Sequence, residues 1–243
     1  MGKESKNLVD YVENQLFQYL KTEKLCPGSM IPGELQLAKQ FGVGRSVVRE
    51  ALSRLRMLGL VKSRTRKGII LTEPDIVSVM QRMITPQILG KDNILDLLGL
   101  RVSLEIGMAD FIIDNATATD IAQLEKNIQQ QEIQSPNQLT IESDHLFHTQ
   151  LYRISGNHTL LKFQEMLYPL LVFIKQNYQE YITCYNHQVP PENLITHAMI
   201  LESIKQKNAS VFRDLMKKHL NLYIELIREE RNTNPHSSNL SDK

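Results

Sequence analysis

Four side chains in the later part of this 243-residue chain could together bind a transition metal. Asp144 and His148 lie four residues apart in a predicted helix, and this spacing puts both side chains on one face, about 6 Å apart. His197 and His219 fall in two later predicted helices. If they converge, one carboxylate and three imidazoles would suit a divalent ion such as Zn, Ni or Mn. The alternative is that these histidines are ordinary surface or core residues.

Two arginines at the start of another predicted helix could contact DNA. Arg45 and Arg49 lie one turn apart in the segment 43–58, on a face separate from its apolar stripe. The stripe consists of Val48, Ala51, Leu52, Leu55 and Leu58. Such a helix fits the major groove, where a guanidinium can contact guanine edges or phosphates. The simpler alternative is a surface helix with solvated arginines.

The elements around these arginines follow the pattern of a winged helix. Amphipathic helices are predicted at 7–22 and 34–41, and Gly42 provides the turn into the arginine-bearing helix. Two β-like runs within 60–72 enclose a basic hairpin. Residues 1–72 carry a net charge of +7, whereas the remainder carries −6. This asymmetry indicates an N-terminal domain that binds an anion such as nucleic acid.

The rest of the chain shows the period of helices and almost no strand signal. Seven helices are expected to pack as an all-α bundle over residues 74–231, after a hinge near Pro74. Their expected positions are about 75–84, 92–115, from 117 onward, 137–155, 159–181 with a kink or break at Pro169, 191–206 and 209–231. The polar residues 232–243 are predicted to form a disordered tail.

Composition narrows the class of protein. A hydrophobic content of 42% and a charged content of 23% are typical of a globular domain protein. The sequence contains neither an apolar run long enough for a transmembrane helix nor a secretory signal. Cys26 and Cys184, the only cysteines, lie far apart, which argues against a disulfide framework. We therefore expect a cytoplasmic protein.

The N-terminal motifs resemble the GntR family of bacterial transcription regulators. The run Leu25-x-Pro-Gly-x-x-Ile-Pro-x-Glu-x-x-Leu-Ala38 precedes Gly42-Val-x-Arg-x-x-Val-Arg-Glu-Ala-Leu52 in the family's order and spacing. Two positions depart from the family pattern: Leu35 stands where arginine is usual, and Gly44 where serine or threonine is usual. Specificity for an operator sequence should therefore depend more heavily on Arg45, Arg49 and the wing.

This resemblance implies a homodimer that binds a palindromic operator, because two-fold symmetry presents two identical reading helices. The implied DNA-binding residues are Arg45, Ser46, Arg49, Arg66, Lys67 and Gly68. The first three belong to the reading helix, and the last three form the tip of the wing.

The second part of the chain resembles the FCD ligand-binding domain of FadR-type regulators. The motifs are Arg101-Val-Ser-Leu-Glu105, Asp144-His-Leu-Phe-His148 with Ser155-Gly-Asn157, the segment from His197 to Ile204, and His219-Leu220. The resemblance implies that Asp144, His148, His197 and His219 hold the metal. We exclude His145, because it is rotated about 100° from Asp144 around the helix. His158, His187 and His236 are interpreted as structural or solvent-facing.

Arg101 is the predicted contact for an effector. An arginine in a mostly apolar helix usually reaches the surface or pairs with a neighbour such as Glu105. The resemblance implies instead that Arg101 faces a cavity and binds a carboxylate, which its planar fork matches. A metal beside a guanidinium would favour a small hydroxy acid, dicarboxylate or sugar acid.

The leading hypothesis is a mainly α protein that acts as a ligand-responsive transcription regulator, a repressor, with a winged helix-turn-helix domain at 1–73. In this hypothesis the metal, with zinc preferred, is a resident part of the effector site. Two alternatives stay open: a regulator that senses the metal itself, and a metal-dependent enzyme joined to a DNA-binding domain. Against the enzyme, no general base stands at a recognisable spacing.

Overall fold

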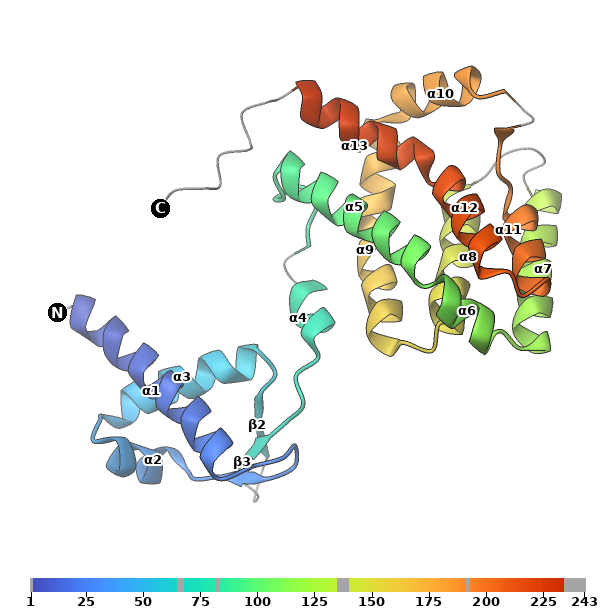
Figure 1. Cartoon of the computed structure of the whole chain (residues 1–243). Helices are drawn as coiled ribbons and strands as arrows, with labels where there is room; N and C mark the ends of the chain where they lie inside the picture. Colours follow the sequence, from blue (N-terminus) through green and yellow to red (C-terminus); the bar gives the residue numbers. More distant parts are fainter. Residues whose placement is uncertain (1, 65–67, 82–83, 135–139, 191–192, 234–243) are drawn as a thin grey trace. The chain divides into compact units, whose positions relative to one another are not determined.

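The computed structural model describes residues 2–64, 68–81, 84–134, 140–190 and 193–233 (Figure 1). By its internal contacts the chain divides into two compact units, Met1–Met83 and Ile84–Lys243. The boundary lies ten residues beyond the one expected from the hinge at residue 73, so that α4 (Ile76–Gln81) belongs to the first unit. No helix in the described ranges is long and apolar enough to cross a membrane.

The first unit is a winged helix-turn-helix, which confirms the predicted fold. Its elements before α4 are α1 (Gly2–Thr22), β1 (Met30–Ile31), α2 (Glu34–Phe41), α3 (Arg45–Met57), β2 (Val61–Arg64) and β3 (Gly68–Leu71). The strands form an antiparallel sheet in the order β1-β3-β2, with Val61 opposite Leu71. The two-residue strand β1 was not predicted, since a pair of residues shows no periodicity; it pairs Met30 with Ile70.

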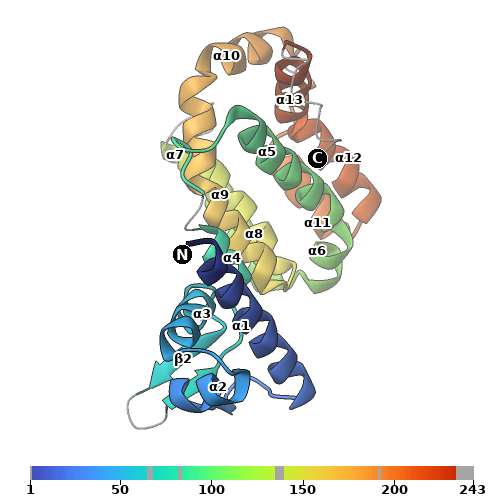
Figure 2. The same cartoon turned by 90° about the vertical axis from the view of Figure 1, so that its left-hand side faces the viewer.

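The apolar stripe of α3 is the centre of this unit. Val48, Ala51, Leu52 and Leu55 are all fully buried, and α1 packs along α3 (Figure 2). Gly42 ends α2 in the left-handed conformation, with φ of +68°, and its N–H donates to the carbonyl of Ala38. Glycine adopts this conformation without the steric cost of a Cβ atom. The turn therefore aims the N-terminal end of α3 away from the core.

The second unit is all-helical in its described residues, as predicted. Its helices are α5 (Lys91–Gly107), α6 (Ala109–Asn115), α7 (Ala118–Gln134), α8 (Ile141–Ile154), α9 (His158–Asn177), α10 (Gln179–Gln188), α11 (His197–Lys205), α12 (Ala209–His219) and α13 (Asn221–Thr233). Six of them pack in a closed ring, in the order α5, α12, α11, α7, α8, α9 and back to α5 (Figures 1 and 2). Side chains from several helices can therefore meet inside the ring.

Several predicted helix limits were wrong. The segments 92–115 and 209–231 each form two helices, with breaks at Met108 and Leu220. Pro169 lies inside α9, which continues to Asn177 before α10 begins. A proline removes only one backbone donor, and the buried leucines around it still favour the helix.

The predicted helix at 191–206 begins only at His197. Residues 137–139 of another predicted helix, and 234–243 of the predicted tail, lie outside the described residues. Side chains cap three of the helices: Asp75 accepts from the N–H of Ser78, Asp120 exchanges hydrogen bonds with Thr117, and Asn208 accepts from the N–H of Val211.

Candidate effector site and DNA-binding face

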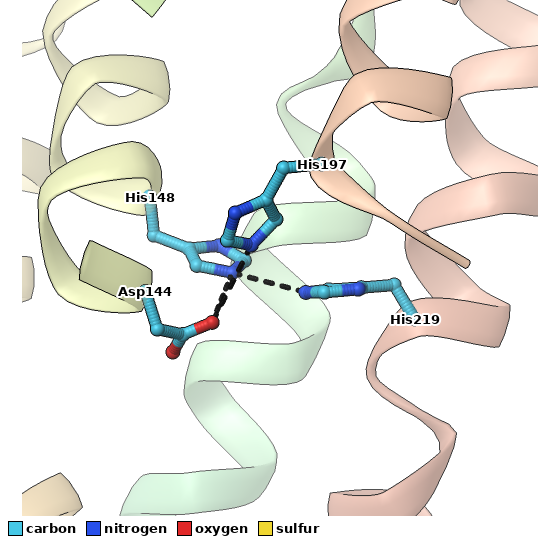
Figure 3. A group of neighbouring side chains, drawn as sticks. All are labelled: Asp144, His148, His197 and His219. Atoms are coloured by element: carbon cyan, nitrogen blue, oxygen red, sulfur yellow. Dashed lines mark hydrogen bonds and ion pairs between the residues drawn. The ribbon is translucent and has the colours of Figure 1, made fainter. Parts of the chain in front are cut away.

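Asp144, His148, His197 and His219 converge inside the helical ring (Figure 3). Their potential ligand atoms all lie within 4.8 Å of one another. The Asp144 Oδ1 atom is 3.5 Å from His148 Nε2 and 3.4 Å from His197 Nε2. His148 Nε2 is in turn 3.3 Å from His219 Nε2. The structure thus brings together all four residues that the sequence singled out, and their role as metal ligands stays a prediction.

Local structure orients each of the four side chains. Thr140 caps α8 by accepting from the N–H of Ser143, and Asp144 and His148 follow one turn apart. His197 is the first residue of α11, and its ring stacks on Phe147 at 3.9 Å between centroids. His219 is the last residue of α12. The side chains on one face of α8 therefore meet those at the start of α11 and at the end of α12.

Close contacts outside the cluster orient two of the imidazoles. His148 Nδ1 lies 2.7 Å from Glu105 Oε2, and His219 Nδ1 lies 2.9 Å from the carbonyl oxygen of Ile195. A proton on each Nδ1 would face these oxygen atoms and would leave the lone pair on Nε2, which points into the cluster. His197 Nε2 is buried and forms no hydrogen bond with a described residue. This set of one oxygen and three nitrogen donors fits a divalent transition metal.

Arg101 reaches the same place from α5. Its side chain and that of Glu105 are both completely buried, and Arg101 Nε donates to Glu105 Oε1 at 2.7 Å. Arg101 Nη2 lies 3.7 Å from Asp144 Oδ2, and the guanidinium carbon lies 5.3 Å from the centre of the Tyr223 ring. Neither Nη1 nor Nη2 forms a hydrogen bond with a described residue. Arg101 therefore pairs with Glu105 and also presents unused donors beside the cluster.

Sequence reasoning missed the second contact of Glu105. One carboxylate oxygen accepts from Arg101 and the other lies against His148, so this residue joins the predicted effector contact to a predicted metal ligand. The spacing of Glu105 four residues after Arg101 indicated only the first contact. The second depends on how α5 packs in the ring.

The charges in the site perturb one another strongly. Burial would raise the pKa of Glu105, but Arg101 and His148 lower it to about 2. Burial would lower the pKa of His148, but Glu105 and Asp144 raise it to about 9. Burial lowers the pKa of His219 to about 4, together with repulsion from His148. In the metal-free site His148 is therefore the histidine that carries an additional proton and a positive charge. A metal ion must displace that proton to bind there.

The remaining histidines lie elsewhere. His145 turns from the cluster toward α9, where its ring centroid is 4.4 Å from that of Tyr168. His158 is exposed at the start of α9, and the exposed His187 contacts the carbonyl oxygen of Thr183 at 2.7 Å. His236 lies outside the described residues.

The predicted DNA-binding residues of α3 lie on an exposed face of the first unit. The side chains of Arg45 and Arg49 are 58% and 60% exposed, and Ser46 is also exposed. Arg49 Nε and Nη2 both donate to Glu34 Oε2 at 3.1 Å, and Arg45 Nη2 lies 3.8 Å from the same oxygen. The hydrogen bond from Arg49 lowers the pKa of Glu34, against a small effect of burial. No sequence pattern predicted that Glu34 would contact both arginines.

The other expected DNA contacts belong to the wing. Gly68 opens β3 with φ of +77°, whereas Arg66 and Lys67 lie outside the described residues. An open groove connects the wing to the helices, and Leu35, which is 56% exposed, lines it. Arg45, Arg56 and Arg64 also line this groove, so it combines basic groups with the apolar side chains of Leu35 and Ile69.

Two family models match the chain. Residues 8–71 match the family described as "Bacterial regulatory proteins, gntR family", and residues 96–222 match the FCD domain. Together the two matched regions include the DNA-binding face and the Asp144 cluster.

Relatives of known function resemble the chain over much of its length. It is 30% identical to the HTH-type transcriptional regulator LutR of Bacillus subtilis, over 63% of this chain and 70% of the relative. It is 28% identical to the Uxu operon regulator of Haemophilus influenzae, over 97% of this chain and 90% of the relative. It is 26% identical to the HTH-type transcriptional repressor NanR of Salmonella newport, over 89% of this chain and 84% of the relative. The chain belongs to the gntR family of bacterial regulatory proteins, and it is a ligand-responsive transcription regulator with an FCD domain rather than an enzyme.

Proposed function

We propose that this regulator is a homodimeric repressor of a near-palindromic operator, controlled by a small carboxylate that binds beside a metal ion. Arg101 is the observation that carries the proposal. The guanidinium is completely buried in the ring, and its Nη1 and Nη2 atoms form no hydrogen bond with a described residue, so they offer donors that match a carboxylate. Repression is supported by the relative NanR, which is itself a repressor.

The proposed ligands of the metal are Asp144, His148, His197 and His219. Four protein ligands would leave one or two coordination positions on Zn²⁺ or a similar ion, and the ion would supply a positive charge for the carboxylate. Arg101 would hold a carboxylate oxygen through its free edge, while Glu105 keeps its other edge in place. Binding would shift the equilibrium between two arrangements of the protein, with a coupling free energy of about 1–3 kcal/mol.

A thermal-shift screen of small carboxylates on metal-loaded protein tests this function, because a ligand that binds the folded state raises its melting temperature. We expect at least one carboxylate to stabilise the protein and to change its affinity for operator DNA. The variant Arg101→Lys should lose this stabilisation, because lysine keeps the charge but lacks the bidentate fork. An unchanged shift in Arg101→Lys would contradict the role of Arg101.

Glu105→Gln is expected to weaken metal binding about 10- to 100-fold, because the amide no longer orients His148 as a carboxylate does. Competition with a chromophoric chelator measures this change directly. Glu142→Gln, an exposed position on α8, serves as the matched control and should leave metal affinity unchanged. Equal affinities for the two variants would show that Glu105 acts on Arg101 alone.

Direct metal sensing is the second candidate function, favoured by the burial of the cluster. His148 is completely buried, and only 15% of the Asp144 side chain is exposed. If the ion is the signal, operator binding will respond to zinc while no carboxylate changes it. In the proposed function, the carboxylate changes operator binding by the zinc-loaded protein.

A further inference from the structure

The charged groups around the cluster can be counted, because the site is almost closed. Arg101 contributes one positive charge, and Glu105 and Asp144 contribute one negative charge each. Among the described residues, Arg101 and Glu105 are the buried side chains that carry a permanent charge, and Asp144 is 15% exposed. Imidazoles bind a metal in their neutral form. The protein groups of the metal-loaded site therefore sum to −1.

A divalent ion changes this sum to +1. An uncompensated charge in a buried site is costly, because water cannot solvate it well. A single carboxylate would neutralise the site and would also satisfy Nη1 and Nη2 of Arg101, which form no hydrogen bond with the described residues. A second carboxylate on the same ligand would bring the sum to −1 again and would have no buried cation of its own.

The other buried polar groups nearby are neutral. Tyr152 lies one turn after His148 on α8, and its hydroxyl is buried without a hydrogen-bond partner in the described chain. Gln164 on α9 is completely buried; its Nε2 lies 3.5 Å from His145 Nδ1, and its Oε1 has no described partner. A phenol is neutral at pH 8. An amide is neutral as well, so neither group supplies a cation for a second carboxylate.

We infer that the effector site selects monocarboxylates over dicarboxylates of the same carbon skeleton. This inference rests on the proposed function and narrows its ligand class.

Matched pairs of acids test the selection on the zinc-loaded, full-length protein at pH 8. Within each pair a terminal CH₂OH group is replaced by a carboxylate: glycerate and tartronate, 2,4-dihydroxybutyrate and malate, gluconate and glucarate. Free zinc is held constant with a metal buffer, because dicarboxylates chelate the ion in solution. Isothermal titration calorimetry then gives the ratio of the two dissociation constants in each pair that binds.

We expect the monocarboxylate to bind roughly tenfold or more tightly than its partner, the ratio that an uncompensated buried charge predicts. A dicarboxylate that binds equally or more tightly would overturn the inference and leave the proposed function intact. If no acid in the panel binds, while zinc alone changes operator affinity, the proposed function fails and this inference fails with it.

Glu105→Gln provides a second measurement, because it raises the charge of the loaded site by one. At saturating zinc, the ratio of the dicarboxylate's dissociation constant to that of the monocarboxylate should fall to one or below in Glu105→Gln. Glu142→Gln should keep the wild-type ratio. A wild-type ratio in Glu105→Gln would show that shape, not charge, selects the ligand. The comparison of wild-type ligand pairs decides the inference even if Glu105→Gln does not fold.

Discussion

Arg49→Ala is expected to reduce operator affinity to that for unrelated DNA, a loss of roughly 10³-fold or more, while the fold stays intact. Arg49 uses its Nε and Nη2 atoms on Glu34, which leaves the outer edge of the guanidinium free for a guanine. Removing Arg49 also leaves Glu34 without this partner on the DNA-binding face, where its charge would repel phosphate. Both effects lower affinity.

The measurement is a binding titration at constant salt, with an operator selected by the wild-type protein from genomic DNA. Lys21→Ala is the matched control, because it removes one positive charge from an exposed site on α1. It should change affinity only slightly. The double variant Glu34→Gln, Arg49→Ala separates the two effects: recovery of affinity would assign the loss to repulsion by Glu34, and continued loss to the missing arginine. Wild-type affinity in Arg49→Ala would remove this residue from the interface.

His197→Ala is expected to lose the bound ion and the stability that the ion provides. A ligand at 100 to 1,000 times its dissociation constant stabilises a folded protein by about 3–4 kcal/mol, and this contribution disappears with binding. The substitution also removes the ring that stacks on Phe147, so part of the destabilisation is independent of metal. Stripping the metal from both proteins isolates that part.

Metal content after purification without chelator, and melting temperatures with and without zinc, measure the effect. His158→Ala, at the exposed start of α9, is the matched control and should keep the wild-type metal content. Zinc should raise the melting temperature of the wild type and of His158→Ala but not of His197→Ala. A wild-type metal-to-protein ratio near zero would contradict the whole site.

The errors in the predicted elements have a common physical origin. The breaks at Tyr178 and Leu220 carry no glycine or proline. Gly107 precedes the break at Met108, but Gly99 lies inside the same helix, so a glycine by itself does not mark a helix end. Pro169 is a helix-breaking residue, yet α9 continues through it. In each case the packing of neighbouring helices outweighs the local preference of one residue.

The sequence alone determined what depends on neighbours along the chain. The period of α3 placed Arg45 and Arg49 opposite a buried stripe, and the four-residue spacing placed Asp144 beside His148. These relations follow from the geometry of the α-helix, which is the same in every fold. His197 and His219 were candidates for the same site by residue type, and the motif resemblance assigned them to it.

Only the tertiary structure decided which distant groups meet. It placed His219 against His148 across 71 residues of sequence, Glu34 against Arg49 across 15, and Glu105 between Arg101 and His148. Helical periodicity specifies the face on which a side chain lies. The partner of that face depends on how whole helices pack against one another, which is set by the burial of many apolar side chains together.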